Sequence, residues 1–251
     1  MSKETGPSQV GALYLVPTLL GSTLGSTLLA TSLPQAVVGL VHELDGFIAE
    51  NAKSARQFLK AVDHPVPLRD VSIVELNEHT PISAFPELLA PVYAGKRIGL
   101  LSEAGCPAVA DPGAGLVALA HREGLRVVPL VGPSSLLLAL MASGLNGQNF
   151  CFHGYLPTER DARAGAIRRV EAESLASGAC QLFIEAPYRN NQLLAALLET
   201  CMPATSLCLA TELTLPGESV RTQRIDAWRS TPMDIDRRPT VFLLQAVPKD
   251  R

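Results

Sequence analysis

The stretch "SEAGCPAVADPG", residues 102–113, follows the apolar run "RIGLL" (97–101) and combines two glycines, two prolines and two acids. Prolines fix the shape of a loop in advance, and glycines let backbone N–H groups come close to a ligand. In open α/β sheets, ligands bind beyond the carboxyl ends of the strands. The stretch therefore predicts a preorganised ligand cradle, although the same residues also serve to close ordinary strand-to-helix turns.

Short apolar runs alternate with longer helical patterns along the whole chain, which is typical of a sheet covered by helices. The patterns predict strands at 12–16, 47–50, 97–102, 126–132, 179–186, 206–213 and 240–246. They predict helices near 53–61, 83–95, 113–124, 133–144, 159–177 and 190–200. We expect an α/β fold of two domains, residues 1–131 and 132–251.

The composition is that of an ordinary globular protein. Of 251 residues, 47% are hydrophobic and 18% are charged, and the formal net charge is −3. A chain with this balance has no global attraction to polyanions. If a nucleic acid binds, it must bind a local basic patch.

Cysteines and histidines give no sign of a disulfide framework or a metal site. The five cysteines form no C-x-x-C pair, which predicts free thiols and a reducing compartment. The five histidines lack metal-ligand spacing, so we expect no metal. The segment "MSKETGPSQV" (1–10) does not resemble a secretory leader, and no apolar run reaches the roughly 18 residues of a membrane span, so we expect a cytoplasmic protein.

Several common nucleotide and nucleophile motifs are absent. The segment "GSTLGS" (21–26) does not have the G-x-G-x-x-G spacing of dinucleotide-binding proteins. Neither the G-x-x-x-x-G-K-[ST] phosphate loop nor a G-x-S-x-G elbow occurs.

Six segments in order resemble one protein family. They are "LYLVPTLLG" (13–21), "LLSEAGCPAVADPG" (100–113), "VVPLVGPSS" (127–135), "FCFHGYLP" (150–157), "IEAPYR" (184–189) and "ATELT" (210–214). They are similar to the patterns V-P-T-P-I-G-N-L, S-D-A-G-T-P-x-x-x-D-P-G, P-G-P-S, F-x-x-E-G-F-L-P, E-S-P-H-R and A-R-E-L-T of the tetrapyrrole methylase superfamily, in its ribosomal RNA small subunit methyltransferase I branch. The resemblance implies two α/β domains with S-adenosylmethionine in the cleft between them, within a homodimer.

The resemblance also implies which residues surround the cofactor. From the first half these are Pro17, Ser102, Gly105, Asp111, Pro112, Gly113, Gly132, Ser134 and Ser135. From the second half they are Glu185, Ala186, Pro187, Ala210, Thr211 and Glu212. Asp111 would face the sulfonium or amino group of the cofactor, or alternatively cap the helix that starts near residue 113.

The chain departs from the family at the loops expected to hold the acceptor, which marks it as a divergent member. The family pattern A-E-D-T-R is Ala49-Glu50-Asn51-Ala52-Lys53 here, and H-x-H-N is Asn77-Glu78-His79-Thr80. In place of the family's S-D-A-G this chain begins with Ser102-Glu103, and in place of E-G-F-L-P it begins with His153-Gly154. The family's K-G-E before the last strand is Arg238-Pro239-Thr240 here.

Methyl transfer mainly requires alignment, and a general base matters when the acceptor is a weak nucleophile such as a ribose hydroxyl. The candidate bases are Glu78, His79, Glu103 and His153, each of which could instead have a structural or solvated role.

Two groups of basic residues could contact RNA, or could simply be solvated helix faces. They are Lys53, Arg56 and Lys60 on one predicted helix, and Arg163, Arg168 and Arg169 on another. The leading function is an S-adenosylmethionine-dependent methyltransferase that acts on a ribose 2′-hydroxyl in RNA. The alternatives are a small, tetrapyrrole-like acceptor, or a non-catalytic regulatory paralogue that binds the cofactor.

Overall fold

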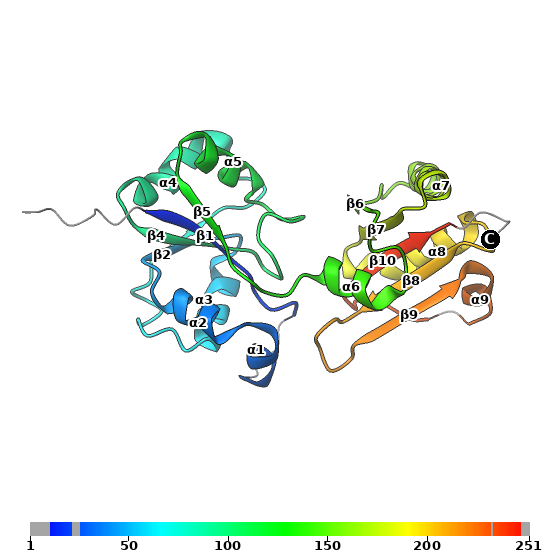
Figure 1. The fold of residues 1–251 in the computed structure, drawn as a ribbon, viewed down its shortest axis with the longest axis horizontal. Helices are drawn as coiled ribbons and strands as arrows, with labels where there is room; N and C mark the ends of the chain where they lie inside the picture. Colours follow the sequence, from blue (N-terminus) through cyan, green and yellow to red (C-terminus); the bar gives the residue numbers. More distant parts are fainter. Residues whose placement is uncertain (1–10, 22–25, 232, 247–251) are drawn as a thin grey trace, which may run out of the picture. The chain divides into compact units, whose positions relative to one another are not determined.

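The computed structural model describes residues 11–21, 26–231 and 233–246. The chain divides into two compact units, residues 1–134 and 135–251 (Figure 1). Each unit has one five-stranded sheet with helices packed on it, so the α/β fold class and the two-domain layout predicted from the sequence are confirmed. Among the described helices, none is both long and apolar enough to cross a bilayer.

The first unit is built on a parallel sheet in the order β3-β2-β4-β1-β5. Its strands are β1 (Ala12–Val16), β2 (Gly46–Ala49), β3 (Ile73–Glu75), β4 (Arg97–Leu101) and β5 (Arg126–Pro129). Each pairing between neighbours is parallel. The carboxyl ends of all five strands therefore lie along one edge of this sheet.

Helices cover both faces of this sheet (Figure 1). They are α1 (Ser26–Ser32), α2 (Gln35–His42), α3 (Ala52–Ala61), α4 (Phe85–Tyr93) and α5 (Ala114–Arg122), with a short 3-10 turn η1 (Ile82–Ala84) before α4. Successive side chains of a strand point to opposite faces. On β2, Phe47 and Ala49 join the core formed with α2 and α3, whereas Ile48 joins the core formed with α4 and α5.

The second unit has a mixed sheet in the order β6-β7-β10-β8-β9. The strands are β6 (Phe150–Tyr155), β7 (Cys180–Ile184), β8 (Ser206–Thr211), β9 (Ser219–Arg224) and β10 (Thr240–Gln245). The central strand β10 is antiparallel to both β7 and β8. The carboxyl ends of β7 and β8 therefore lie at the same edge of the sheet as the start of β10.

Helices α6 (Ser135–Ser143), α7 (Arg160–Ser177), α8 (Asn190–Thr200) and α9 (Ile225–Ser230), with the 3-10 turn η2 (Pro187–Arg189), complete this unit. Apolar side chains of α7, α8 and α9 form one core with the sheet. Trp228 on α9 is fully buried in it, and its indole N–H donates to the Leu207 carbonyl at 2.8 Å.

Candidate functional site

The candidate site is built from the loops that leave the carboxyl edge of the first unit's sheet. The residues predicted to surround the cofactor from this half fall into three of these loops, which follow β1, β4 and β5. Because β4, β1 and β5 are adjacent in the sheet, the three loops are neighbours in space as well. The structure thus brings together Pro17, Ser102, Gly105, Asp111, Pro112, Gly113, Gly132 and Ser134 at one rim, whereas Ser135 begins α6 of the second unit.

Hydrogen bonds tie the three loops together. The Thr18 N–H donates to the Gly105 carbonyl at 2.9 Å, and the buried Thr18 hydroxyl donates to the Ser102 carbonyl at 3.4 Å. The Cys106 thiol donates to the Pro133 carbonyl at 3.5 Å. We call these three joined loops, residues 17–21, 102–113 and 130–134, the cradle.

Two glycines of the cradle are required by close packing. A Cβ atom on Gly132 would overlap the ring of Pro17, so only glycine lets these two loops touch. Gly113 has φ +127°, a conformation that side chains rarely adopt, and a Cβ there would lie 2.9 Å from Cδ2 of Leu100. Both residues therefore hold the backbone of the cradle in a shape that other residues would disturb.

The cradle also contains backbone strain. Ala108 and Ala110 adopt positive φ angles of 65° and 64°. This left-handed conformation costs a non-glycine residue roughly 1 kcal/mol or more. Strain of this kind gathers at ligand sites, where surrounding contacts hold the backbone in place.

Three carboxylates lie near one another at this rim. Burial, together with the nearby charges of Glu50 and Glu103, raises the pKa of Asp111 to about 6, although an interaction with the Ser102 side chain lowers it. Burial also raises the pKa of Glu50, although the Glu103 N–H donates to the Glu50 carboxylate at 3.3 Å. The rim is therefore negatively charged, and a cation bound there would relieve the repulsion.

The alternative role considered for Asp111, capping the following helix, is wrong. Helix α5 begins at Ala114, its N-cap residue is Gly113, and no side chain caps it. The carboxylate of Asp111 instead interacts with Ser102 across the loop.

Asp111→Asn is expected to stabilise the fold at neutral pH. Because the pKa of Asp111 is raised from 3.8 to about 6 in the folded state, the wild type should lose stability relative to the variant as pH rises from about 4 to about 6. Melting temperatures measured at both ends of this range should be higher for the variant than for the wild type only at the higher pH. The exposed Asp70, changed to Asn, is the matched control. A constant difference across the range would contradict the prediction.

Of the candidate bases in the first unit, only Glu103 lies in the cradle. It is the second residue after β4, is exposed, and its carboxylate accepts a hydrogen bond from the Ser54 hydroxyl at 3.0 Å. Glu78 and His79 lie in the loop after β3, at the same sheet edge, and pair with each other at 3.6 Å, with 83% and 85% of their side chains exposed. A solvated pair of this kind has little to fix its geometry.

The fourth candidate, His153, lies on β6 of the second unit and is half-buried. The Gln181 amide N–H donates to the Ala179 carbonyl at 3.3 Å, so the amide oxygen faces the Nε2 atom of His153 at 2.6 Å. In a neutral ring, Nε2 must then carry the proton, which leaves Nδ1 as the basic atom.

The predicted cofactor residues of the second unit also share one sheet edge. Glu185, Ala186 and Pro187 follow β7, and Ala210, Thr211 and Glu212 lie at the end of β8. Two ion pairs hold these segments. The Arg189 guanidinium donates to Glu185 Oε1 at 2.6 and 3.0 Å, and Arg238 donates to Glu212 Oε2 at 2.7 and 3.0 Å. The buried Oε2 of Glu185 has no partner within the described chain.

The two ion pairs are expected to differ in their effect on stability. The Glu185 side chain is fully buried, whereas 27% of the Glu212 side chain is exposed. Removing the partner of a buried charge leaves that charge uncompensated. Arg189→Met should therefore lower the melting temperature more than Arg238→Met, as measured by circular dichroism. Equal losses would contradict this ranking.

Sequence reasoning missed four polar residues that shape these sites: Glu50, Arg189, Asn190 and Arg238. Glu50 stands directly after a buried strand, which was a usable signal. Asn190 is buried, and its amide donates to the Arg238 carbonyl at 2.6 Å. No described group of three or more histidine, cysteine, aspartate or glutamate residues could hold a metal ion.

Solved structures of two methyltransferases have the same architecture as this chain. The methyltransferase CobJ aligns with a TM-score of 0.61 at 16% identity, over 94% of both chains. Uroporphyrin-III-C-methyltransferase from Thermus thermophilus aligns with a TM-score of 0.55 at 18% identity, again over 94% of both chains. The chain thus shares the fold of these two methyltransferases.

Relatives that match in sequence identify a particular family. The chain is 30% identical over 217 residues to ribosomal RNA small subunit methyltransferase I of Escherichia coli O157:H7, covering 86% of this chain and 70% of that protein. It is 35% identical over 216 residues to the protein of the same name from Mesorhizobium japonicum, covering 86% and 68%. No family model matches the chain. The chain belongs to the ribosomal RNA small subunit methyltransferase I family, and it is a methyltransferase.

Proposed function

We propose that the chain transfers a methyl group from S-adenosylmethionine to a ribose 2′-hydroxyl in RNA of the small ribosomal subunit. The cradle carries this proposal, because three adjacent strand ends are joined into one rigid, acidic rim. The names of the relatives support RNA as the acceptor.

The residues of the cradle fit S-adenosylmethionine. The ligand carries a sulfonium and an ammonium group, and the carboxylates of Asp111, Glu50 and Glu103 favour a cation. Gly132 and Gly105 open the backbone where a Cβ would meet Pro17 or Leu20. When bound, the cofactor supplies an electrophilic methyl group. From the second unit, we propose Glu185, Ala186, Pro187, Ala210, Thr211 and Glu212 as further contacts.

A base is needed on the acceptor side, because a ribose hydroxyl must lose its proton as its oxygen bonds to the methyl carbon. Bound S-adenosylmethionine would supply the methyl group, and its sulfur would keep the electron pair of the carbon–sulfur bond. We assign the base to Glu103, whose carboxylate is exposed at the cradle and oriented by Ser54. Lys53 and Arg56 are exposed on the neighbouring α3 and are proposed to contact RNA phosphates. A homodimer is proposed from the family resemblance alone.

Calorimetric titration and a labelled methyl donor test this proposal together. S-adenosylmethionine and S-adenosylhomocysteine should bind the wild type, whereas ATP, which lacks the cationic group, should not. Small ribosomal subunits should then accept labelled methyl groups, recovered as a 2′-O-methylnucleoside after digestion. A DNA copy of the labelled segment, which lacks the 2′-hydroxyl, should accept none.

Other outcomes separate the alternatives. Labelling of a tetrapyrrole precursor but not of RNA would identify a small-molecule enzyme. Cofactor binding without transfer to either acceptor would favour a regulatory role. No cofactor binding by folded protein would remove the proposal.

A further inference from the structure

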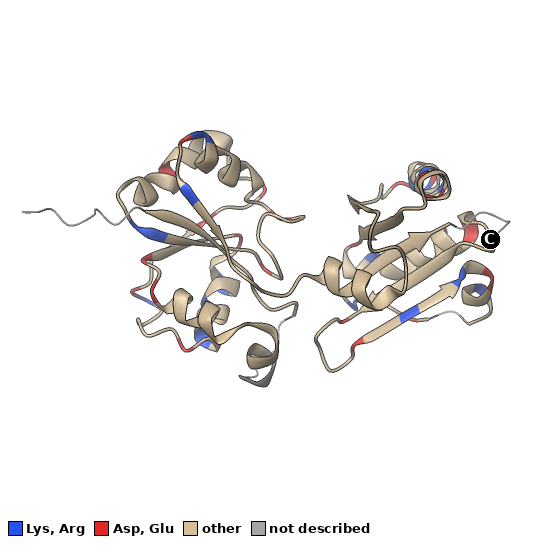
Figure 2. Ribbon diagram, viewed as in Figure 1, with Lys and Arg blue, Asp and Glu red and all other residues tan. Residues whose placement is uncertain are grey.

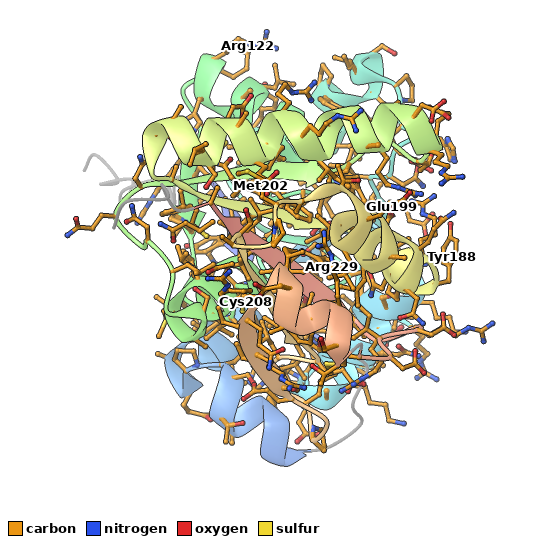
Figure 3. The ribbon with its side chains drawn as sticks, turned by 90° about the vertical axis from the view of Figure 1, so that its right-hand side faces the viewer. Arg122, Tyr188, Glu199, Met202, Cys208 and Arg229 are labelled. Atoms are coloured by element: carbon orange, nitrogen blue, oxygen red, sulfur yellow. The ribbon has the colours of Figure 1, made fainter. Side chains whose placement is uncertain are left out.

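A groove of about 720 Å³ runs between α7 and α8 of the second unit. Its lining includes Ala164, Ala195 and Ala196, whose short side chains leave the space between the helices open, and Arg163, Arg168 and Gln192, which give it polar walls. Figure 3 shows α7 lying across this unit beside α8, with Glu199 labelled on α8. We call this feature the α7–α8 groove.

Arg163 is a buried cation without a carboxylate partner in the described chain. Arg163 is only 4% exposed, its Nη1 atom donates to the Thr158 carbonyl at 3.4 Å, and its Nε atom has no partner. The nearby Glu159 carboxylate accepts from the N–H groups of Asp161 and Ala162 at 3.0 and 2.7 Å, and the charge of Arg163 adds to the lowering of its pKa without a direct ion pair. Burying an unpaired guanidinium is costly unless an anion compensates it.

The other charges of the groove divide into paired and unpaired groups. Arg160 pairs with Glu199 at 3.5 Å, and Asp161 adds a second acid. Arg168 is exposed and forms no ion pair with any residue that the structure describes. Figure 2 shows basic and acidic residues mixed along α7. Arg168 therefore provides the exposed positive charge of the groove, and the buried Arg163 adds to the positive potential there.

We propose that the α7–α8 groove binds backbone phosphate of the RNA acceptor, an inference that rests on the proposed function. A guanidinium matches a phosphate with two parallel hydrogen bonds. Large apolar anchors, which dominate protein–protein hot spots, are absent from the lining, and this favours a phosphate over a protein segment. The groove contains no group assigned to the reaction, so it would position the RNA rather than take part in the chemistry.

The test uses a fluorescein-labelled oligouridylate RNA, with binding to the full chain followed by anisotropy over a range of salt concentrations. Arg168→Gln should weaken binding and reduce the log–log salt slope by about one, the expectation for one lost phosphate contact. Arg169→Gln is the matched control, because Arg169 is the next residue, is exposed, pairs with Glu173 at 3.9 Å and does not line the groove. It should leave the slope unchanged.

Three results would overturn the inference: equal effects of the two substitutions, no effect of either, or no binding by the wild type. Tighter binding of a polyglutamate peptide with the same dependence on Arg168 would instead assign the groove to an acidic protein. Cofactor titration and methyl transfer by the wild type report separately on the proposed function. If the protein methylates RNA but Arg168→Gln leaves the salt slope unchanged, only the inference about the groove is wrong. If it does not methylate RNA but the salt slope depends on Arg168, only the proposed function is wrong.

Discussion

Replacing Glu103 by glutamine is expected to slow methyl transfer to RNA by about 10²- to 10⁴-fold, the usual contribution of a general base. Glutamine keeps the size of the side chain and can still bond to the Ser54 hydroxyl, which lies 3.0 Å from the carboxylate. It cannot accept the proton of the ribose hydroxyl. Single-turnover rates at saturating cofactor measure this step directly, so any loss of cofactor affinity caused by the removed charge does not enter the measured rate.

Two further variants sharpen this test. Glu78→Gln removes an exposed acid from the same sheet edge and should leave the rate unchanged. Glu103→Asp restores a carboxylate, and aspartate is the residue that the family pattern has in this place, so it should recover most of the rate. If Glu103→Gln and Glu103→Asp lose activity together with cofactor affinity, Glu103 shapes the cradle rather than acting as a base.

Gly132→Ala is expected to abolish cofactor binding and to destabilise the first unit. The added Cβ would overlap the buried ring of Pro17, so the loops after β1 and β5 must separate. Overpacking of this kind typically costs about 1–3 kcal/mol of unfolding free energy. Denaturant unfolding measures that loss, and calorimetry measures the loss of S-adenosylmethionine binding.

Gly39→Ala provides the control for this substitution. Gly39 lies within α2, and a Cβ there would meet nothing within 4 Å. Alanine in a helix interior is favoured over glycine by roughly 0.5–1 kcal/mol, so this variant should be at least as stable as the wild type and bind normally. Normal cofactor binding by Gly132→Ala would show that the cradle is not the cofactor site.

The sequence predicted those elements whose local pattern is strong. β1, β4 and α8 were expected within one residue of their observed bounds, because apolar runs bounded by turn residues mark them clearly. β3 has three residues, and β9 reads "SVRTQR" with mostly polar side chains, so neither has the pattern of a buried strand. Both lie at sheet edges, where pairing with one neighbour is enough to form them.

The candidate site likewise has features that a local sequence pattern predicts and features that depend on the folded structure. The cradle loops were found because glycine, proline and acids cluster at strand ends, which is a local signal. The raised pKa of Asp111 and the contact of Glu185 with Arg189 depend on burial and on neighbours. Asn51, a departure from the family, still caps α3 by accepting from the N–H groups of Lys53 and Ser54 at 2.9 and 3.3 Å. The local effect of this substitution follows only from the structure.

The central position of β10 determines when the second unit can form during synthesis. The first unit's sheet is complete once residue 129 has been made, so that half has all its strands early. In the second unit, β10 lies between β7 and β8 and is the strand that joins them, and it ends at Gln245. Until that strand leaves the ribosome, both neighbours keep open edges of the kind that recruit other chains. The second unit of a newly made chain is therefore most exposed to aggregation in the period after β7 and β8 have left the ribosome and before β10 has followed them.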